Sequence, residues 1–320
     1  MAAPEVDQAI SYIRQIAVRR IPVEIVEEND VHVVELHHVP LGVVGGITPW
    51  NFPVLLALWK VAPALITGNT FVLKPTPYTP LTALRFGQIA QSVLPAGVLS
   101  VLSGGDQLGP QMTNHPDVAK ISFTGSTETG KHVLRSAAGT VKRVTLELGG
   151  NDAAIVLPDA DYKAIIPQLF WGAFGNQGQW CVGIKRLYIH RSFHADFVAA
   201  FVDYAKTVKV GDGLDPEVGL GPVQNKMQFD KLKTFLDDIK ANGQKIAFGG
   251  DIDETQSGYF FPITVVDNPP ENSKIVQEEQ FGPIIPIIVY DDIDDAVNRA
   301  NASIYGLGGS VWGRDTEAAV

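Results

Sequence analysis

A single cysteine, Cys181, is the first residue whose chemistry has to be explained. It lies in GNQGQWCVGIKR, a stretch punctuated by glycines and not an apolar run. A free cysteine can serve as a small buried hydrophobe with no chemistry at all. A thiolate, in contrast, is a strong nucleophile that forms covalent intermediates with carbonyl compounds. The motifs elsewhere in the chain have to decide between these two interpretations.

Short motifs with polar side chains follow several β-like runs of the sequence. They are TPWNFP after residues 41–47, KPTPYTP after 69–74, FTGSTETG after 118–123 and ELGGN at the end of 141–148. Ligands of open parallel sheets bind beyond the carboxyl ends of the strands, so a site is expected among these motifs. FTGSTETG sets Gly125 and Ser126 at a helix start, where backbone N–H groups suit a phosphate. Taken singly, Trp50, Lys74 and Glu147 also fit a packing residue, a loop charge and a surface acid.

The apolar periodicity predicts alternating strands and helices. Residues 23–39 alternate polar and apolar side chains around Asn29-Asp30, which predicts a β-hairpin. Five β-like runs follow, at 41–47, 69–74, 97–102, 118–123 and 141–148. Helical patterns occupy the N-terminal 20 residues, 52–67, 80–93 and 126–138. The helix at 80–93 is expected to have Thr79 as its cap and Pro80 as its first residue. An acidic helix start is expected within 291–300. Strand–helix repetition of this kind predicts an α/β fold, with a mostly parallel sheet covered by helices on both faces.

Composition excludes several classes of function. The 320 residues are 45% hydrophobic and 19% charged, which suits two domains with a sizeable core. The net charge of −10 argues against nucleic acid or an anionic membrane as the main partner. The longest apolar stretch, FPVLLALWKVAPALITG, contains Lys60 and Pro63 and predicts a buried helix, not a membrane span. The single cysteine and the absence of a secretory signal pattern indicate a cytoplasmic protein, and the histidines form no metal-ligand pattern, so no metal is expected.

The motifs become specific in combination. TPWNFP, KPTPYTPL, FTGSTETG, LELGG, GNQGQWC and EEQFGP occur in that order, and this combination resembles the aldehyde dehydrogenase superfamily, in particular its NAD(P)-dependent hydrolytic branch. The similarity extends from the first helix to GLGGSVWGRD. It implies a Rossmann-like parallel-sheet cofactor domain in residues 1–22 and 40–149 and a β-hairpin oligomerisation arm at 23–39. It also implies a second α/β catalytic domain at 150–320.

The resemblance implies a catalytic role for three residues. Cys181 matches the nucleophile, whose thiolate attacks an aldehyde to give a thiohemiacetal and, after hydride transfer, a thioester. Asn51, in PWNF, matches the side chain that donates to the developing oxyanion together with the Cys181 backbone N–H. Glu147, in LELGG, matches the general base that activates water to hydrolyse the thioester. The expected reaction is the NAD(P)-dependent oxidation of an aldehyde to a carboxylic acid.

The cofactor residues carry over in the same way. Lys74 matches the residue that bonds the adenosine ribose, and Ser126 matches the pyrophosphate contact. Glu279, in EEQFGP, matches the acid that bonds the nicotinamide ribose. The other positions expected beside the cofactor are Ile47, Thr48, Trp50, Pro77, Gly105, Gly125, Leu148 and Phe281. NAD is the expected cofactor, and NADP is also permitted.

The surroundings of Cys181 indicate the kind of aldehyde. Trp180 and Val182 flank the cysteine, where many relatives have further cysteines or polar residues. The side chains expected to form an apolar substrate channel are Phe52, Leu56, Trp59 and Trp180. These side chains favour a hydrophobic or aromatic aldehyde of medium size, although a simple core position suits Leu56 equally well.

The two ends of the chain depart from the family pattern. Family members begin earlier and continue past Val320 with a strand that joins a neighbouring subunit's sheet, so we expect a chain truncated at both ends. DTEAAV is expected to start a helix capped by Asp315, and the full-length form is expected to be a homodimer or tetramer. Two alternatives stay open: a CoA-acylating enzyme, against which Glu147 argues, and an impaired or non-enzymatic member of the fold.

Position 77 generates a test of cofactor choice. Many NAD-preferring relatives carry a glutamate three residues after the ribose lysine, where this chain has Pro77. Pro77→Glu should therefore weaken NADP binding selectively, because a carboxylate repels the 2′-phosphate. Dissociation constants for NAD and NADP, measured on both proteins, check this prediction. An equal loss for the two cofactors would mean that position 77 only shapes the loop.

Overall fold

The computed structural model describes residues 2–317 and 319. The chain divides into two compact units, Met1–Leu148 and Gly149–Val320. This division falls one residue before the boundary expected between the cofactor and catalytic domains. Within the described residues, every helix is too short or too polar to cross a bilayer.

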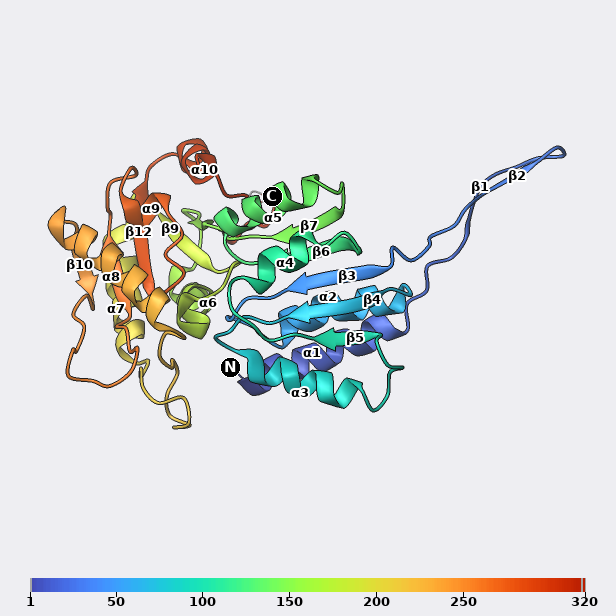
Figure 1. The fold of residues 1–320 in the computed structure, drawn as a ribbon. Helices are drawn as coiled ribbons and strands as arrows, with labels where there is room; N and C mark the ends of the chain where they lie inside the picture. Colours follow the sequence, from blue (N-terminus) through green and yellow to red (C-terminus); the bar gives the residue numbers. More distant parts are fainter. Residues whose placement is uncertain (1, 318, 320) are drawn as a thin grey trace. The chain divides into compact units, whose positions relative to one another are not determined.

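The first unit combines a hairpin with a layered α/β body (Figure 1). Its helices are α1 (Ala2–Ala17), α2 (Leu55–Ile66), α3 (Pro80–Ala90), α4 (Leu108–Asn114) and α5 (Thr127–Ala138). Its strands are β1 (Glu24–Glu28), β2 (Val33–Leu36), β3 (Val43–Ile47), β4 (Thr70–Lys74), β5 (Leu99–Val101), β6 (Val118–Thr124) and β7 (Arg143–Glu147). The strands and helices predicted for this half from apolar periodicity are therefore confirmed, with ends that differ by a few residues.

The sheet of the first unit is parallel and has the strand order β5-β4-β3-β6-β7. The first strand of this order to appear in the sequence, β3, lies in its middle. The chain proceeds from β3 to β4 and β5 on one side, and then to β6 and β7 on the other. This reversal creates a topological switch point between β3 and β6, the place where α/β sheets bind their ligands.

Close packing holds the central strand of this sheet against its helices. Phe71, Leu73 and Val44 are almost completely buried and belong to one apolar cluster with residues of α2 and α3. Gly46 lies in β3 where a Cβ would overlap the ring of Phe71. The ring occupies the space that any larger residue at position 46 would need, so glycine is required there by packing.

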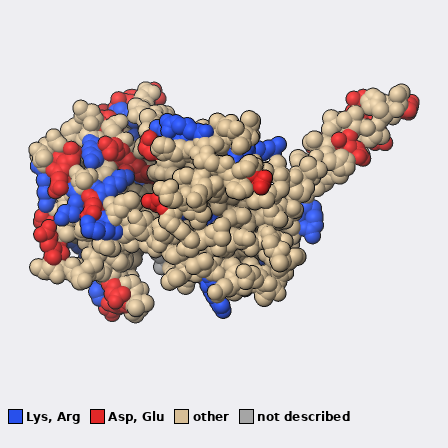
Figure 2. Space-filling view, viewed as in Figure 1, with Lys and Arg blue, Asp and Glu red and all other residues tan. Residues whose placement is uncertain are grey.

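The hairpin of β1 and β2 projects away from the sheet of its own unit (Figure 1). The two strands pair antiparallel, and every residue of both is exposed. Between Ile21 and Leu41 the sequence contains four glutamates and one aspartate, and neither lysine nor arginine. The acidic side chains are visible along the arm in Figure 2. The hairpin predicted around Asn29-Asp30 is thus confirmed as a secondary structure.

The second unit is built on a mixed sheet. Its helices are α6 (Tyr162–Phe174), α7 (His194–Lys206), α8 (Lys226–Ala241), α9 (Lys274–Gln277) and α10 (Ile293–Asn301), with short 3-10 turns at Gly175–Gly178 and Arg191–Phe193. Its strands are β8 (Asp152–Val156), β9 (Ile184–His190), β10 (Lys245–Phe248), β11 (Thr264–Asp267), β12 (Ile284–Tyr290) and β13 (Gly309–Trp312). The strand order is β10-β11-β12-β9-β8-β13, and within this described sheet only the β10–β11 pairing is antiparallel.

Two apolar clusters fill the two faces of this mixed sheet. One joins α6 and α7 to the sheet through Phe170, Phe174 and Phe201, and the other joins α8 and α9 through Phe235 and Ile275. All five side chains are almost fully buried. A second α/β unit and the acidic helix start within 291–300, which is α10 capped by Asp292, agree with the sequence predictions.

Three sequence expectations need correction or lie outside the description. The stretch 52–67 does contain a helix, α2, but that helix is not buried all round, because Trp59 is 47% and Ile66 41% exposed. Thr79 precedes α3 as expected, yet its side chain makes no capping hydrogen bond. The helix predicted from Asp315 runs into residues 318 and 320, which lie outside the described residues, and Thr316 and Glu317 form a turn.

The packing at Gly46 generates a stability prediction. Gly46→Ala should lower the free energy of unfolding by about 1–3 kcal/mol, because the new methyl group has to displace the Phe71 ring. Gly109→Ala in α4 is the matched control, since a Cβ there meets nothing within 4 Å. Urea denaturation of both variants measures the difference, and a neutral Gly46→Ala would contradict it.

Candidate active site

The carboxyl edge of the parallel sheet brings three of the predicted site residues, Ile47, Lys74 and Glu147, together in the first unit. Ile47 at the end of β3 pairs with Lys74 at the end of β4. Thr124 at the end of β6 pairs with Glu147 at the end of β7, and β3 lies between β4 and β6. Strand ends that are separated by up to a hundred residues in the sequence therefore share one edge, as expected for a ligand site of this fold.

This edge has features that fit a dinucleotide. The Thr48 hydroxyl is buried and has no hydrogen-bond partner among the described residues. Lys74 is also buried, and burial lowers the pKa of its ammonium, with Asp106 opposing the shift. The Gly125 N–H donates to the Glu147 carbonyl at 3.0 Å, and the Ser126 hydroxyl caps α5 by accepting from Thr129 N–H at 3.2 Å. An unsatisfied hydroxyl, a buried cation and a helix N-terminus are groups that a ribose and a phosphate can satisfy.

The segment from Trp50 to Phe52 forms the turn that leads into α2. Trp50, Asn51 and Phe52 are all half-buried. The Glu5 carboxylate of α1 accepts from the N–H groups of Val54 at 2.7 Å and Leu55 at 3.0 Å. This carboxylate satisfies two of the free N–H groups at the start of α2 and so anchors the turn that carries Asn51. Sequence analysis missed Glu5, because its partners are about fifty residues away.

The remaining positions predicted in the first unit differ in exposure. Pro77 and Gly105 lie in exposed turns. The Leu148 side chain lies so close to Gly130 that a Cβ at Gly130 would be 2.5 Å from it. Leu56 is buried, with 5% of its surface exposed, whereas Trp59 is half exposed and its ring lies 6.1 Å from that of Tyr12. Their assignment to the cofactor and the substrate stays a prediction.

Lys60 is a buried residue of this unit that the sequence analysis treated only as a helix residue. Its ammonium donates to the hydroxyls of Thr124 at 2.7 Å and Ser122 at 3.3 Å. Burial lowers its pKa to about 8, while the Glu147 carboxylate acts in the opposite direction. Lys60 therefore connects α2 to the strand edge beside Glu147 and carries a charge that changes within the range of ordinary assays.

In the second unit, a left-handed turn precedes the cysteine. Asn176, Gln177 and Gly178 all have positive φ angles, of 51°, 60° and 68°. A Cβ at Gly178 would lie 2.5 Å from the Gly282 carbonyl oxygen, so glycine is required there by conformation and by space. Non-glycine residues with positive φ are uncommon and occur where surrounding structure holds them. This turn accounts for Gly178, and Cys181 follows it shortly before β9 begins at Ile184.

Cys181 itself is half-buried. Burial raises the pKa of its thiol, and the N–H of Val182, the Lys185 ammonium and its own N–H lower it, while the Glu279 carboxylate raises it further. The thiol is thus surrounded by groups that stabilise a thiolate and by one that opposes it. Burial is the largest of these effects, so the pKa of the thiol lies above its ordinary value.

Glu279 lies behind the segment that follows the first unit's last strand. Its carboxylate accepts from the Gly150 N–H at 3.1 Å, and a Cβ at Gly149 would overlap it. Burial raises the pKa of this carboxyl, and Lys185 and Lys231 oppose the shift. Lys231 of α8, which the sequence analysis missed, donates to the Glu279 carbonyl at 2.8 Å. Phe281 has a φ of 52°, and the centre of its ring lies 5.9 Å from the Lys185 ammonium.

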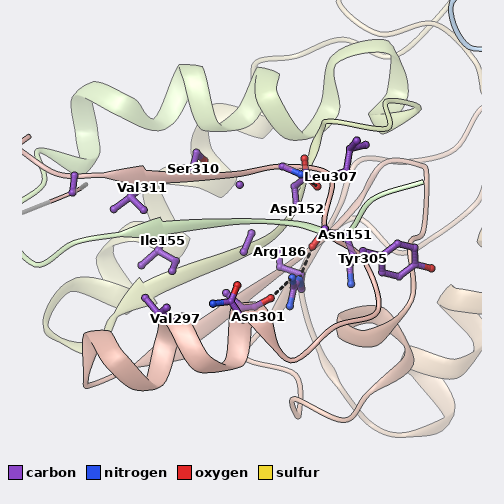
Figure 3. A pocket seen from close by; sticks show the side chains of 16 residues that line it. Asn151, Asp152, Ile155, Arg186, Val297, Asn301, Tyr305, Leu307, Ser310 and Val311 are labelled. Atoms are coloured by element: carbon purple, nitrogen blue, oxygen red, sulfur yellow. Dashed lines mark hydrogen bonds between the residues drawn. The ribbon is translucent and has the colours of Figure 1, made fainter. Parts of the chain in front are cut away.

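Two cavities lie in the second unit, and one of them borders the residues on either side of Cys181. Trp180 and Val182 line a cavity of about 320 Å³ together with Trp312. A larger one, of about 580 Å³, lies between β8, β13 and α10 (Figure 3). Arg186 spans it, donating to the carbonyls of Asn151 and Ala300 at 2.9 Å each. Neither Cys181 nor Glu279 lines the larger cavity. No cluster of three or more potential metal ligands occurs within residues 2–317 and 319.

The buried charge of Lys60 generates a pH-dependent prediction. Because its folded pKa of about 8 lies below the ordinary 10.5, its charge destabilises the folded state up to pH 8, and that cost disappears as the pH rises toward 10.5. Wild type should therefore gain roughly 1–2 kcal/mol of unfolding free energy relative to Lys60→Met between pH 8 and pH 10. Denaturation of both proteins across this range tests it, and a pH-independent difference would contradict the assignment.

The chain is similar to known proteins in both sequence and fold. The sequence profile of the aldehyde dehydrogenase family matches residues 1–320. Aldehyde dehydrogenase LUC3 of a Fusarium species is 44% identical over 320 residues, which are 99% of this chain and 67% of that protein. An aldehyde dehydrogenase of Mycobacterium tuberculosis, solved with NAD+, superposes with a TM-score of 0.93 at 38% identity, over 98% of this chain and 65% of the other. A mutant of AldC from Pseudomonas syringae, solved with NAD+ and octanal, has a TM-score of 0.93 at 36% identity, over 100% and 66%.

Each of these matches covers only part of the related protein. The chain spans about two thirds of the relatives and solved structures that it resembles. Within that span, the family profile covers the chain from end to end, and the folds superpose closely. The chain belongs to the aldehyde dehydrogenase family.

Proposed function

We propose that this protein oxidises an aldehyde to a carboxylic acid with NAD, or NADP, through a covalent intermediate on Cys181. The observation that carries the proposal is the environment of the chain's one thiol. Cys181 follows a left-handed turn with positive φ angles, and backbone N–H groups and a buried ammonium partly offset burial, which raises the pKa of its thiol. Membership of the aldehyde dehydrogenase family supports this role.

The first half of the proposed reaction is attack by the Cys181 thiolate on the aldehyde carbon. The carbon–sulfur bond forms, and the carbonyl electrons move to the oxygen, which becomes an oxyanion. The Asn51 side chain and the Cys181 N–H would donate to this oxygen, as the family motif implies. A nicotinamide dinucleotide, when bound, supplies the hydride acceptor that turns the resulting thiohemiacetal into a thioester.

The second half of the proposed reaction is hydrolysis. Glu147 would take a proton from water, whose oxygen then attacks the thioester carbon and displaces the Cys181 thiolate. Glu147 is exposed at the end of β7, so water can reach its carboxylate. The presence of this carboxylate favours hydrolysis over transfer of the acyl group to CoA.

The residues proposed to hold the cofactor carry over from the family motifs. The Thr48 hydroxyl and the Lys74 ammonium are buried polar groups that suit ribose hydroxyls, and the start of α5 at Ser126 suits the pyrophosphate. Glu279 suits the second ribose, and its N–H partner Gly150 holds the carboxylate in place. Ile47, Trp50, Pro77, Gly105, Gly125, Leu148 and Phe281 complete the proposed set.

An apolar aldehyde is the proposed substrate. Phe52, Leu56, Trp59 and Trp180 offer aromatic and aliphatic surface, and half of Trp59 is exposed and available for contact. The related AldC structure contains octanal, an apolar aliphatic aldehyde, which supports the same class here. The exposed acidic hairpin is proposed to contact a second copy of the chain in a homodimer or tetramer, and the single cysteine suits a reducing cytoplasmic compartment.

Separate roles for the base and the nucleophile give a kinetic test. Glu147→Gln should slow steady-state turnover and still release one burst of NAD(P)H per site, since hydride transfer precedes hydrolysis. Cys181→Ala is the matched control and should show neither burst nor turnover while it still binds cofactor. Stopped-flow absorbance with an apolar aldehyde measures both. Loss of the burst in Glu147→Gln would show that Glu147 acts chiefly on the thiol, and turnover by Cys181→Ala above about a thousandth of wild type would overturn the proposal.

A further inference from the structure

Lys185 is a buried ammonium directly behind the cysteine turn. It is the second residue of β9, and its side chain is only 1% exposed. Its Nζ donates to the Trp180 carbonyl at 2.5 Å and to the Gly183 carbonyl at 3.1 Å. These two carbonyls bracket Cys181 in the sequence. Burying a charged group away from water is costly, so a side chain in this position calls for an explanation beyond simple packing.

The contact with Trp180 controls the orientation of one particular peptide. The Trp180 carbonyl and the Cys181 N–H belong to the same planar peptide unit, and in a trans peptide they point in opposite directions. Lys185 holds the carbonyl on its own side through a charge-assisted hydrogen bond. The Cys181 N–H is thereby directed away from Lys185. Rotation of this peptide would break the bond to a buried ammonium and leave the charge without that acceptor.

The same ammonium acts on the thiol through its charge. The charged or titratable groups that face Lys185 are Glu279, Asp152 of β8, Cys181 itself and Lys231 of α8. Among them, the Glu279 carboxylate raises the pKa of the Cys181 thiol and Lys185 lowers it. Because the site is poorly hydrated, a charge there interacts more strongly than it would in water. Removal of Lys185 would leave the Glu279 carboxylate as the charged side chain that acts on the thiol.

We propose that Lys185 is a positioning residue for Cys181, which fixes the Trp180–Cys181 peptide so that its N–H is available to an oxyanion and stabilises the thiolate. The inference rests on the proposed role of Cys181 as the nucleophile. It adds to that role a cation that has no contact of its own with substrate. A purely structural lysine would affect stability and would leave both the peptide orientation and the thiol ionisation unchanged.

The first test uses the fact that the chain contains one cysteine. Protein labelled with ¹⁵N-cysteine gives a single amide resonance, that of Cys181. In wild type this resonance should shift with a midpoint near pH 8, where Lys185 loses its proton. In Lys185→Met the shift should be absent, and in Lys231→Met, which removes another cation beside Glu279, it should persist. A wild-type resonance that does not move between pH 7 and pH 9 would overturn the positioning role without recourse to any variant.

The second test measures the thiol directly and needs no dehydrogenase activity, so its failure is distinct from failure of the proposed function. The rate of iodoacetamide alkylation follows the thiolate fraction of Cys181. Lys185→Met should slow alkylation at pH 7.5 roughly five- to tenfold, because Lys185 is still largely charged at that pH. Lys185→Arg, which keeps the charge, should restore most of the rate, and Lys231→Met should leave the rate near that of wild type. Equal alkylation rates for wild type and Lys185→Met at pH 7.5 would overturn the electrostatic role.

Discussion

The parallel pairing of β3 with β4 on one side and β6 on the other is the constraint on which the first unit depends. It sets Lys74, Ile47 and Thr124 along one edge, and the next pairing adds Glu147. Gly46 lets the Phe71 ring pack against the central strand, and so keeps the helices close to the sheet. A change that shifted this register by one residue would reverse the face of every side chain at the edge.

Buried lysines are the second recurring feature of a chain whose net charge is negative. Lys60, Lys74 and Lys185 are each less than a tenth exposed, and burial lowers the pKa of all three ammonium groups. Each lies at or beside a residue of the proposed site: Lys60 next to Glu147, Lys74 at the strand edge and Lys185 behind Cys181. Because a buried charge costs folding free energy, each of these lysines lowers the stability of its own unit while it is charged.

The elements of the first unit could be predicted from sequence because their signals are local. Alternation around Asn29-Asp30, β-branched runs and helix-start residues such as Ser126 depend on neighbours within a few positions. The exposed fraction of each helix was harder to predict than the presence of the helix. Residues 52–67 are apolar almost throughout, yet Trp59 and Ile66 reach the surface, since hydrophobicity along a helix does not say how much of its circumference is covered.

The sequence by itself determined that one thiol exists, that a glycine turn opens a helix after β6, and that the motifs occur in the order of the aldehyde dehydrogenase family. Tertiary structure alone decided which groups surround that thiol. Gly150 and Glu279 are 129 residues apart and Lys60 and Thr124 are 64 apart, and Lys185 meets the carbonyl of Trp180 across the turn at Cys181 and Val182. Such contacts depend on strand order and on the space left between side chains, and no local pattern of residues encodes either of them.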